Sequence, residues 1–291
     1  MGKIIGTGVA LVTPFNSDHS IDFDALKKLI NYVIDGGVEY LVLLGTTAES
    51  ATLSSSEKIQ IVNYCKEINK NRIPIVLGIG GNNTSNVIKQ IKMFDLDGIE
   101  AILSVCPYYN KPSQMGIYNH YAELAKNSPL PIILYNVPSR TSVNISSNTV
   151  LKLANDFKNI VAIKEASGDL EQIMRIIKDK PKDFLVISGD DPLTLPMIYM
   201  GGKGVISVLA QSHPKEFSKM VSNSLLGKID LANKLHYELF QLYNPLFIEG
   251  NPVGIKACLE TLGIIKSFVR LPLSEASKEL KDIFINILNK N

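Results

Sequence analysis

Short apolar runs recur along most of this chain, separated by longer stretches in which apolar and polar residues mix. The runs begin roughly 25 to 35 residues apart and have the length of buried strands. They occupy positions 7–12, 40–44, 75–78, 101–105, 132–135, 160–164, 184–187 and 204–208. The pattern therefore predicts eight strands that are buried on both faces, as in a parallel sheet.

The stretches between the runs have the period of amphipathic helices. Across 23–34, apolar residues return every three or four positions. Helix-capping residues mark the predicted starts: Ser-Ser-Ser-Glu at 54–57, Thr84-Ser85, and Pro192 in the first turn of the seventh helix. Strand and helix alternate eight times, which predicts an α/β fold, a (β/α)8 TIM barrel.

The alternation stops at about residue 228. Three stretches of helical period follow, at 229–243, 252–262 and 274–288. The sequence thus predicts a catalytic barrel over 1–227 and an appended C-terminal helical segment over 228–291. Because the junction lacks a linker rich in Gly, Ser or Pro, the segment is expected to pack firmly on the barrel.

Composition and charge exclude several classes of partner. The formal net charge is +2 over 291 residues and no dense Lys/Arg block occurs, so neither nucleic acid nor an anionic membrane is expected. No leader pattern precedes the first strand and no apolar stretch approaches the roughly 18 residues that span a bilayer, which favours a cytoplasmic protein. The three cysteines and four histidines lack ligand spacing, so no metal cofactor is predicted.

Two polar residues end consecutive predicted strands, Tyr135 after 132–134 and Lys164 after 160–163. In a parallel barrel, side-chain alternation places both on the inner face, at the carboxyl end where barrel enzymes hold their reactive groups. The same alternation turns four residues toward the outer helices: Ile132, Leu134, Val161 and Ile163. The sequence therefore predicts an amine beside a phenol.

That pair suggests covalent chemistry on a ketone. Burial disfavours the charged form of a lysine, so an amine there can act as a neutral nucleophile while the phenol moves protons. The alternative is a structural lysine at a loop start, solvated or paired with Glu165.

Further candidates lie in the loops after other strands. The backbone amides and hydroxyls of Thr46 and Thr47, which follow a glycine, could bind a carboxylate, although a turn or helix cap would look the same. Arg140 lies in a Pro-Ser-Arg-Thr loop after the Tyr135 strand and could grip a carboxylate with two hydrogen bonds; a surface arginine is the alternative. The Tyr108–Tyr109 pair follows another strand, and by itself it could be part of a packed loop.

Eight motifs in order resemble the dihydrodipicolinate synthase (4-hydroxy-tetrahydrodipicolinate synthase) family of pyruvate-dependent Schiff-base lyases, over essentially the whole chain. They are GTGVALVTPF from Gly6, GTTAES from Gly45, PYYNKPSQMG from Pro107, YNVPSRT from Tyr135, IKEASGD from Ile163, SGDD from Ser188, GGKGVISV from Gly201 and EGNPVGIKA from Glu249.

The resemblance implies an activity in lysine (diaminopimelate) biosynthesis without a cofactor. Pyruvate would form a Schiff base with Lys164, and its enamine would attack L-aspartate 4-semialdehyde to give 4-hydroxy-tetrahydrodipicolinate. Tyr135, Thr46 and Tyr109 match the family's proton-relay triad. Tyr109 would reach into a neighbouring subunit's site, which implies an oligomer, typically a homotetramer built as a dimer of dimers.

The resemblance also implies the substrate-binding residues. Thr47 would hold the pyruvate carboxylate, Ile206 would make a main-chain contact near the pyruvyl group, and Arg140 would bind the carboxylate of the semialdehyde. Two alternatives stay open. One is a related lyase acting on N-acetylneuraminate or a 2-keto-3-deoxy sugar acid, although such enzymes generally lack an arginine at the position of Arg140. The other is a non-catalytic barrel that binds a keto acid.

The chain departs from the family pattern in two places. Ala48 replaces a usual glycine and could restrict its turn. At the family's lysine feedback site, four residues match: Ser50, Ala51, Asn82 and Tyr108. Ser55 and Lys58 replace histidines of inhibited members, and Asn86 replaces a glutamate. A cation gained and a carboxylate lost should weaken binding of a cationic amino acid, so little feedback inhibition by L-lysine is expected.

Overall fold

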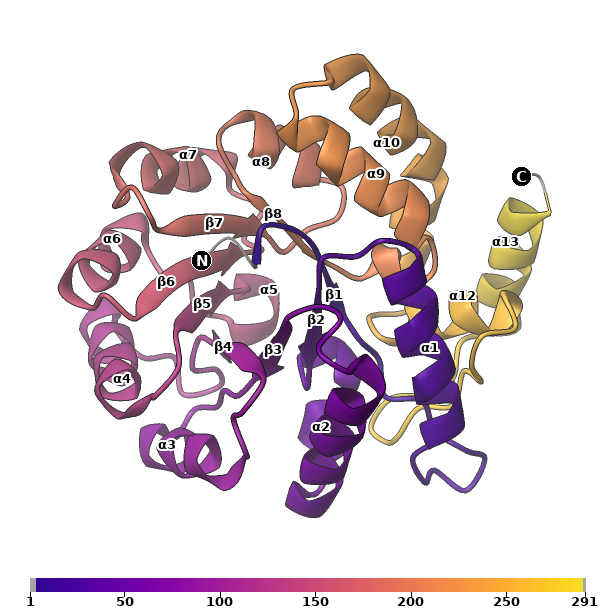
Figure 1. Ribbon diagram of the computed structural model, residues 1–291, viewed down its shortest axis with the longest axis horizontal. Helices are drawn as coiled ribbons and strands as arrows, with labels where there is room; N and C mark the ends of the chain where they lie inside the picture. Colours follow the sequence, from indigo (N-terminus) through magenta and orange to yellow (C-terminus); the bar gives the residue numbers. More distant parts are fainter. Residues whose placement is uncertain (1–3, 290–291) are drawn as a thin grey trace.

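Eight parallel strands close into a barrel in chain order, with β8 pairing with β1. The computed structural model describes residues 4–289, and Figure 1 shows the barrel enclosed by helices. The strands are β1 (Gly6–Ala10), β2 (Tyr40–Leu43), β3 (Ile75–Gly78), β4 (Ile99–Val105), β5 (Ile132–Asn136), β6 (Ile160–Glu165), β7 (Leu185–Ser188) and β8 (Gly204–Ser207). The predicted TIM barrel is confirmed.

Helices follow the strands and cover the outside of the barrel. They are α1 (Phe23–Asp35), α2 (Ser55–Asn69), α3 (Thr84–Met93), α4 (Gln114–Asn127), α5 (Pro138–Thr141), α6 (Ser147–Asp156), α7 (Leu170–Asp179), α8 (Thr194–Tyr199) and α9 (Pro214–Leu225). Within residues 4–289, no helix is both long and apolar enough to cross a membrane.

Capping side chains mark the start of several of these helices. The predicted capping box before α2 is present, because Ser54 accepts from the backbone of Glu57 and the Glu57 side chain accepts from the backbone of Ser54. At α3 the cap is one residue earlier than predicted, at Asn83. The prediction that Pro192 lies in the first turn of a helix is wrong. The hydroxyl of Thr194 instead donates to the Asp190 carbonyl (3.0 Å), extending the turn after β7 so that α8 begins after the proline.

The C-terminal segment consists of four helices in the described part of the chain. They are α10 (Ile229–Tyr243), the short α11 (Pro245–Ile248), α12 (Val253–Thr261) and α13 (Lys278–Leu288). The last begins later than predicted, at a cap supplied by Ser277, whose side chain accepts from the backbone of Leu280. Residues Val253 to Leu259 of α12 are all buried, so the segment packs firmly, as expected. A domain boundary at residue 228 stays a prediction.

The core has two clusters, one inside the barrel and one between strands and helices. Ile133, Tyr135 and Ala162 belong to the inner cluster. The predicted outward position is confirmed for three residues, Ile132, Leu134 and Ile163. It is wrong for Val161, which packs in the inner cluster. The register between β5 and β6 shifts after Ile132, and such a bulge gives β6 one extra residue and turns Val161 inward.

Candidate active site

Tyr135 and Lys164 are direct neighbours at the carboxyl ends of β5 and β6. The two residues pair in the parallel register, and their side chains are 7% and 6% exposed. The Nζ atom of Lys164 lies 4.4 Å from the centroid of the Tyr135 ring. The predicted amine beside a phenol is therefore present, and both groups are shielded from water.

Glu165 does not pair with this lysine. Its carboxylate accepts hydrogen bonds from Asn136 Nδ2 (3.0 Å), from the backbone of Ser167 (2.8 Å) and from Gln172 Nε2 (3.2 Å). Glu165 is fully buried, and this burial raises the pKa of its carboxyl group. Consecutive strand residues point to opposite faces, so Glu165 supports the strand end from the helix side. The interpretation of Lys164 as solvated or paired with Glu165 is wrong.

Gly189, in the loop after β7, leaves room for the Lys164 side chain. A Cβ atom at this position would lie 2.9 Å from Cε of Lys164 and 2.8 Å from the Cβ of Ala166. Both separations are too short for carbon atoms that are not bonded. The glycine is thus required by the position of the amine, a role that sequence reasoning missed, although the SGDD motif contains it.

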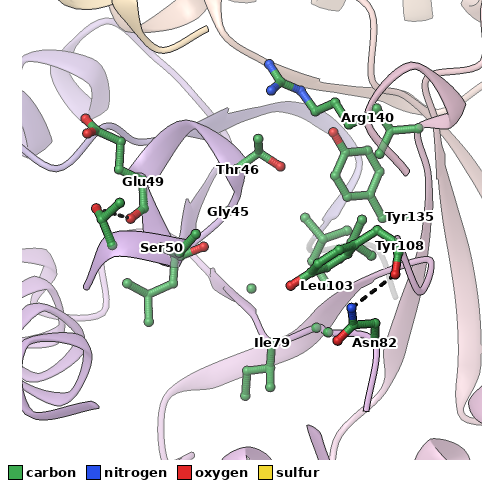
Figure 2. Close-up of a pocket in the computed structure, with 18 of the residues that line it drawn as sticks. Gly45, Thr46, Glu49, Ser50, Ile79, Asn82, Leu103, Tyr108, Tyr135 and Arg140 are labelled. Atoms are coloured by element: carbon green, nitrogen blue, oxygen red, sulfur yellow. Dashed lines mark hydrogen bonds between the residues drawn. The ribbon is translucent and has the colours of Figure 1, made fainter. Parts of the chain in front are cut away.

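A cavity of about 590 Å³ opens at this end of the barrel. Thr46, Tyr135 and Arg140 line it together, and Figure 2 shows all three facing one space. The loops after β3 and β4 also line the cavity, including Asn82 and Tyr108, and Asn82 Nδ2 donates to the Tyr108 carbonyl (3.1 Å). A small organic acid would fit in a cavity of this size.

The Thr46–Thr47 pair lies in a 3-10 turn, Thr46–Ala48, directly after β2. Thr46 borders the cavity, whereas Thr47 is buried and its Oγ1 accepts from Asn251 Nδ2 (2.9 Å). Ala48 is not among the residues with positive φ, so alanine fits there and does not strain the turn. Asn251 comes from the C-terminal segment, and sequence reasoning gave it no role beyond its motif.

Arg140 lies on the short helix α5 rather than in a loop. The helix begins at Pro138, whose carbonyl accepts a hydrogen bond from the backbone N–H of Ser142. Its Nη2 donates to the carbonyl of Asn251 (3.2 Å), and the side chain is otherwise exposed on the cavity wall. The remaining guanidinium donors are therefore available to an anionic group in the cavity.

Four of the predicted residues are not among those that line the cavity: Lys164, Thr47, Tyr109 and Ile206. Tyr109 is 88% exposed on a backbone with φ of 73°, outside the site of its own chain. Ile206 lies on β8 and packs in the inner cluster. In the described residues, no three His, Cys, Asp or Glu side chains gather as a metal site would require.

Comparison with known proteins gives consistent results. The model of the dihydrodipicolinate synthetase family matches residues 3–291. The 4-hydroxy-tetrahydrodipicolinate synthase of Flavobacterium psychrophilum is 55% identical over 293 residues, covering 100% of both chains. A structure of the chloride-inhibited dihydrodipicolinate synthase of Acinetobacter baumannii with pyruvate is 37% identical over 98% of both chains, with a TM-score of 0.95. A lysine-bound structure of the enzyme from Cyanidioschyzon merolae is 36% identical over 98% of this chain and 97% of that one, with a TM-score of 0.93. The chain therefore belongs to the dihydrodipicolinate synthetase family.

Proposed function

We propose that this chain is a 4-hydroxy-tetrahydrodipicolinate synthase, which condenses pyruvate with L-aspartate 4-semialdehyde in lysine biosynthesis. The observation that carries the proposal is the buried amine of Lys164 against the Tyr135 ring, beside a cavity that also presents Thr46 and Arg140. Relatives named for this activity match the full length of the chain and support the same conclusion.

The reaction begins when Lys164 Nζ adds to the C2 carbonyl of pyruvate and water leaves, which forms a Schiff base. Loss of a methyl proton then gives an enamine, whose carbon attacks the aldehyde of the second substrate. The amine of that substrate next attacks C2, which closes the ring and releases Lys164. Tyr135 moves the protons in these steps together with Thr46.

The carboxylates of the two substrates require separate partners. Thr47 holds that of pyruvate, with Ile206 contributing a main-chain contact near the pyruvyl group, and Arg140 binds that of the semialdehyde. Tyr109 would complete the relay in a neighbouring subunit, which its exposure on this chain permits. A homotetramer in the cytoplasm is the expected working form.

The direct test is turnover by the purified protein with pyruvate and L-aspartate 4-semialdehyde, coupled to the reductase that consumes the product. Oxidation of the reductase's nicotinamide cofactor should depend on both substrates. Absence of turnover while borohydride still traps a pyruvate adduct would keep the Schiff base and reject this second substrate.

Two alternative functions can be separated by simple assays. A sugar-acid lyase would release pyruvate from N-acetylneuraminate or a 2-keto-3-deoxy sugar acid, and Arg140 on the cavity wall favours the semialdehyde over such substrates. A non-catalytic keto-acid-binding barrel would bind pyruvate without a covalent adduct. Pyruvate release from the sugar acid identifies the lyase. Mass spectrometry after borohydride treatment identifies the non-catalytic barrel, because only that protein would lack a pyruvate adduct.

Replacing Arg140 with alanine is expected to remove productive use of the semialdehyde while leaving the pyruvate adduct intact. Charge-assisted hydrogen bonds contribute about 1.5–3 kcal/mol each, so kcat/KM for the semialdehyde should fall about 100-fold. Steady-state kinetics with each substrate varied measures this. Arg140→Lys keeps the charge and loses the planar fork. Its kcat/KM for the semialdehyde should therefore lie between that of the unmodified protein and that of Arg140→Ala. Unchanged turnover in Arg140→Ala would contradict the assigned role.

Weak inhibition by L-lysine is a second expectation for this chain. Six of the seven residues at the family's feedback position line the same cavity, and Ser55 does not. The six are Ser50, Ala51, Lys58, Asn82, Asn86 and Tyr108. Burial lowers the pKa of Lys58, because its charge is already poorly solvated, and a second cation beside it would be repelled.

Turnover should therefore change little when millimolar L-lysine is added to the coupled assay. The matched variant combines Lys58→His with Asn86→Glu, which removes the cation and supplies a carboxylate, and it should become more sensitive. Strong inhibition of the unmodified protein below millimolar lysine would refute the expectation.

A further inference from the structure

A buried ion pair joins the C-terminal segment to the loop that follows β2. Lys256, on α12, is fully buried, and its Nζ lies 2.5 Å from Oε1 of Glu49. The same ammonium donates to the carbonyl of Phe268 (2.8 Å), and Oε2 of Glu49 accepts from the backbone N–H of Arg270 (3.0 Å). Both side chains are thus held in one geometry by several contacts.

Stability alone is a poor explanation for such a pair. Removing two charges from water is unfavourable, and packed apolar side chains often stabilise a core at least as well. Burial lowers the pKa of Lys256 to about 8 even though Glu49 acts in the opposite direction. The pair is better explained by the geometry that it fixes.

That geometry is the backbone of the turn carrying Thr46 and Thr47. Glu49 has φ of 54° and ψ of 35°, a left-handed conformation that is uncommon for a residue with a side chain. Its backbone N–H donates to the carbonyl of Thr46 (3.1 Å), which closes the turn. Figure 2 shows the Glu49 carboxylate directed away from Tyr135 and Arg140, so the side chain holds the turn from behind.

The surrounding contacts strengthen the same connection. The centroid of the Phe15 ring lies 4.2 Å from Nζ of Lys256 and 4.5 Å from the guanidinium carbon of Arg270. Arg270 also donates to the carbonyl of Thr52 (3.1 Å), just beyond the turn. Because Asn251 also donates to Thr47, which precedes Glu49, the C-terminal segment contacts the loop after β2 on both sides of Glu49.

We propose that the Glu49–Lys256 ion pair positions Thr46 and Thr47 for catalysis, so that the C-terminal segment sets the geometry of the pyruvate end of the site. Both are positioning residues, since they act through the turn and not on the substrate. The inference rests on the proposed function in one respect, the roles of Thr46 and Thr47 toward pyruvate.

The test uses Lys256→Met, Glu49→Gln and the variant that combines them. The double variant leaves neither charge of the pair buried without its partner. Misplacing the turn should raise KM for pyruvate and lower kcat, together about 10- to 100-fold in kcat/KM. The apparent KM for the semialdehyde, measured at saturating pyruvate, should change much less. Lys281→Met is the matched control, because it breaks the ion pair between Lys281 and Glu260 (2.9 Å) in the same segment without touching the loop.

Amide hydrogen exchange over residues 44–53 gives a readout that does not depend on activity. Exchange should rise in the folded double variant and stay unchanged in Lys281→Met. The proposal would be overturned if the double variant had wild-type kinetics and wild-type exchange. It would also be overturned if Lys281→Met showed defects as large as those of the double variant. If the unmodified protein forms no pyruvate adduct on Lys164, the proposed function fails, while the exchange result still decides whether the pair holds the turn.

Discussion

Replacing Lys164 with alanine is expected to abolish both the pyruvate adduct and turnover. The amine is the only described lysine nitrogen placed against the Tyr135 ring, and a Schiff base cannot form without it. Loss of a covalent nucleophile should lower kcat by about 10³-fold or more. Borohydride trapping followed by mass spectrometry measures the adduct, and the coupled assay measures turnover.

Lys58→Ala is the matched control, because Lys58 is a lysine that lines the cavity and has no role in the proposed reaction. This variant should still be labelled by pyruvate and borohydride, with the label at Lys164. A label that persists in Lys164→Ala would place the Schiff base on another lysine and refute the assigned nucleophile.

Replacing Tyr135 with phenylalanine should be nearly as damaging, because it removes the phenol and keeps the ring that packs against Lys164. Proton transfer by a positioned side chain contributes about 10²- to 10⁴-fold, and kcat should fall within that range. The fold should be unaffected, since Phe fills nearly the same volume as Tyr. Single-turnover measurement of adduct formation with pyruvate alone would show whether the loss begins at the Schiff-base step.

Tyr108→Phe removes a second phenol from the lining of the same cavity and serves as the comparison. Because Tyr108 is not in the proposed relay, turnover by the Tyr108→Phe variant should change only a few-fold. Equal losses in the two variants would indicate that cavity polarity, and not a relay through Tyr135, controls the rate.

The periodic features of the fold and the central pair of the site could be predicted from the sequence. Strand residues alternate at a period of two, so Tyr135 and Lys164 had to share the inner face once their strands were neighbours. The one error on these strands, Val161, comes from a bulge, which depends on how two strands pair and leaves no mark on the sequence of either one. The motifs also located Arg140, although its short helix was expected to be a loop.

The sequence by itself determined the barrel, the reactive lysine and its phenol neighbour, because these follow from local periodicity and from residue types at strand ends. Only the tertiary structure decided what supports them. Thr47 and Asn251 are 204 positions apart, and Glu49 and Lys256 are 207 apart. Contacts across such separations have no local pattern, because they form only when the closed barrel brings the C-terminal segment back over the loop after β2.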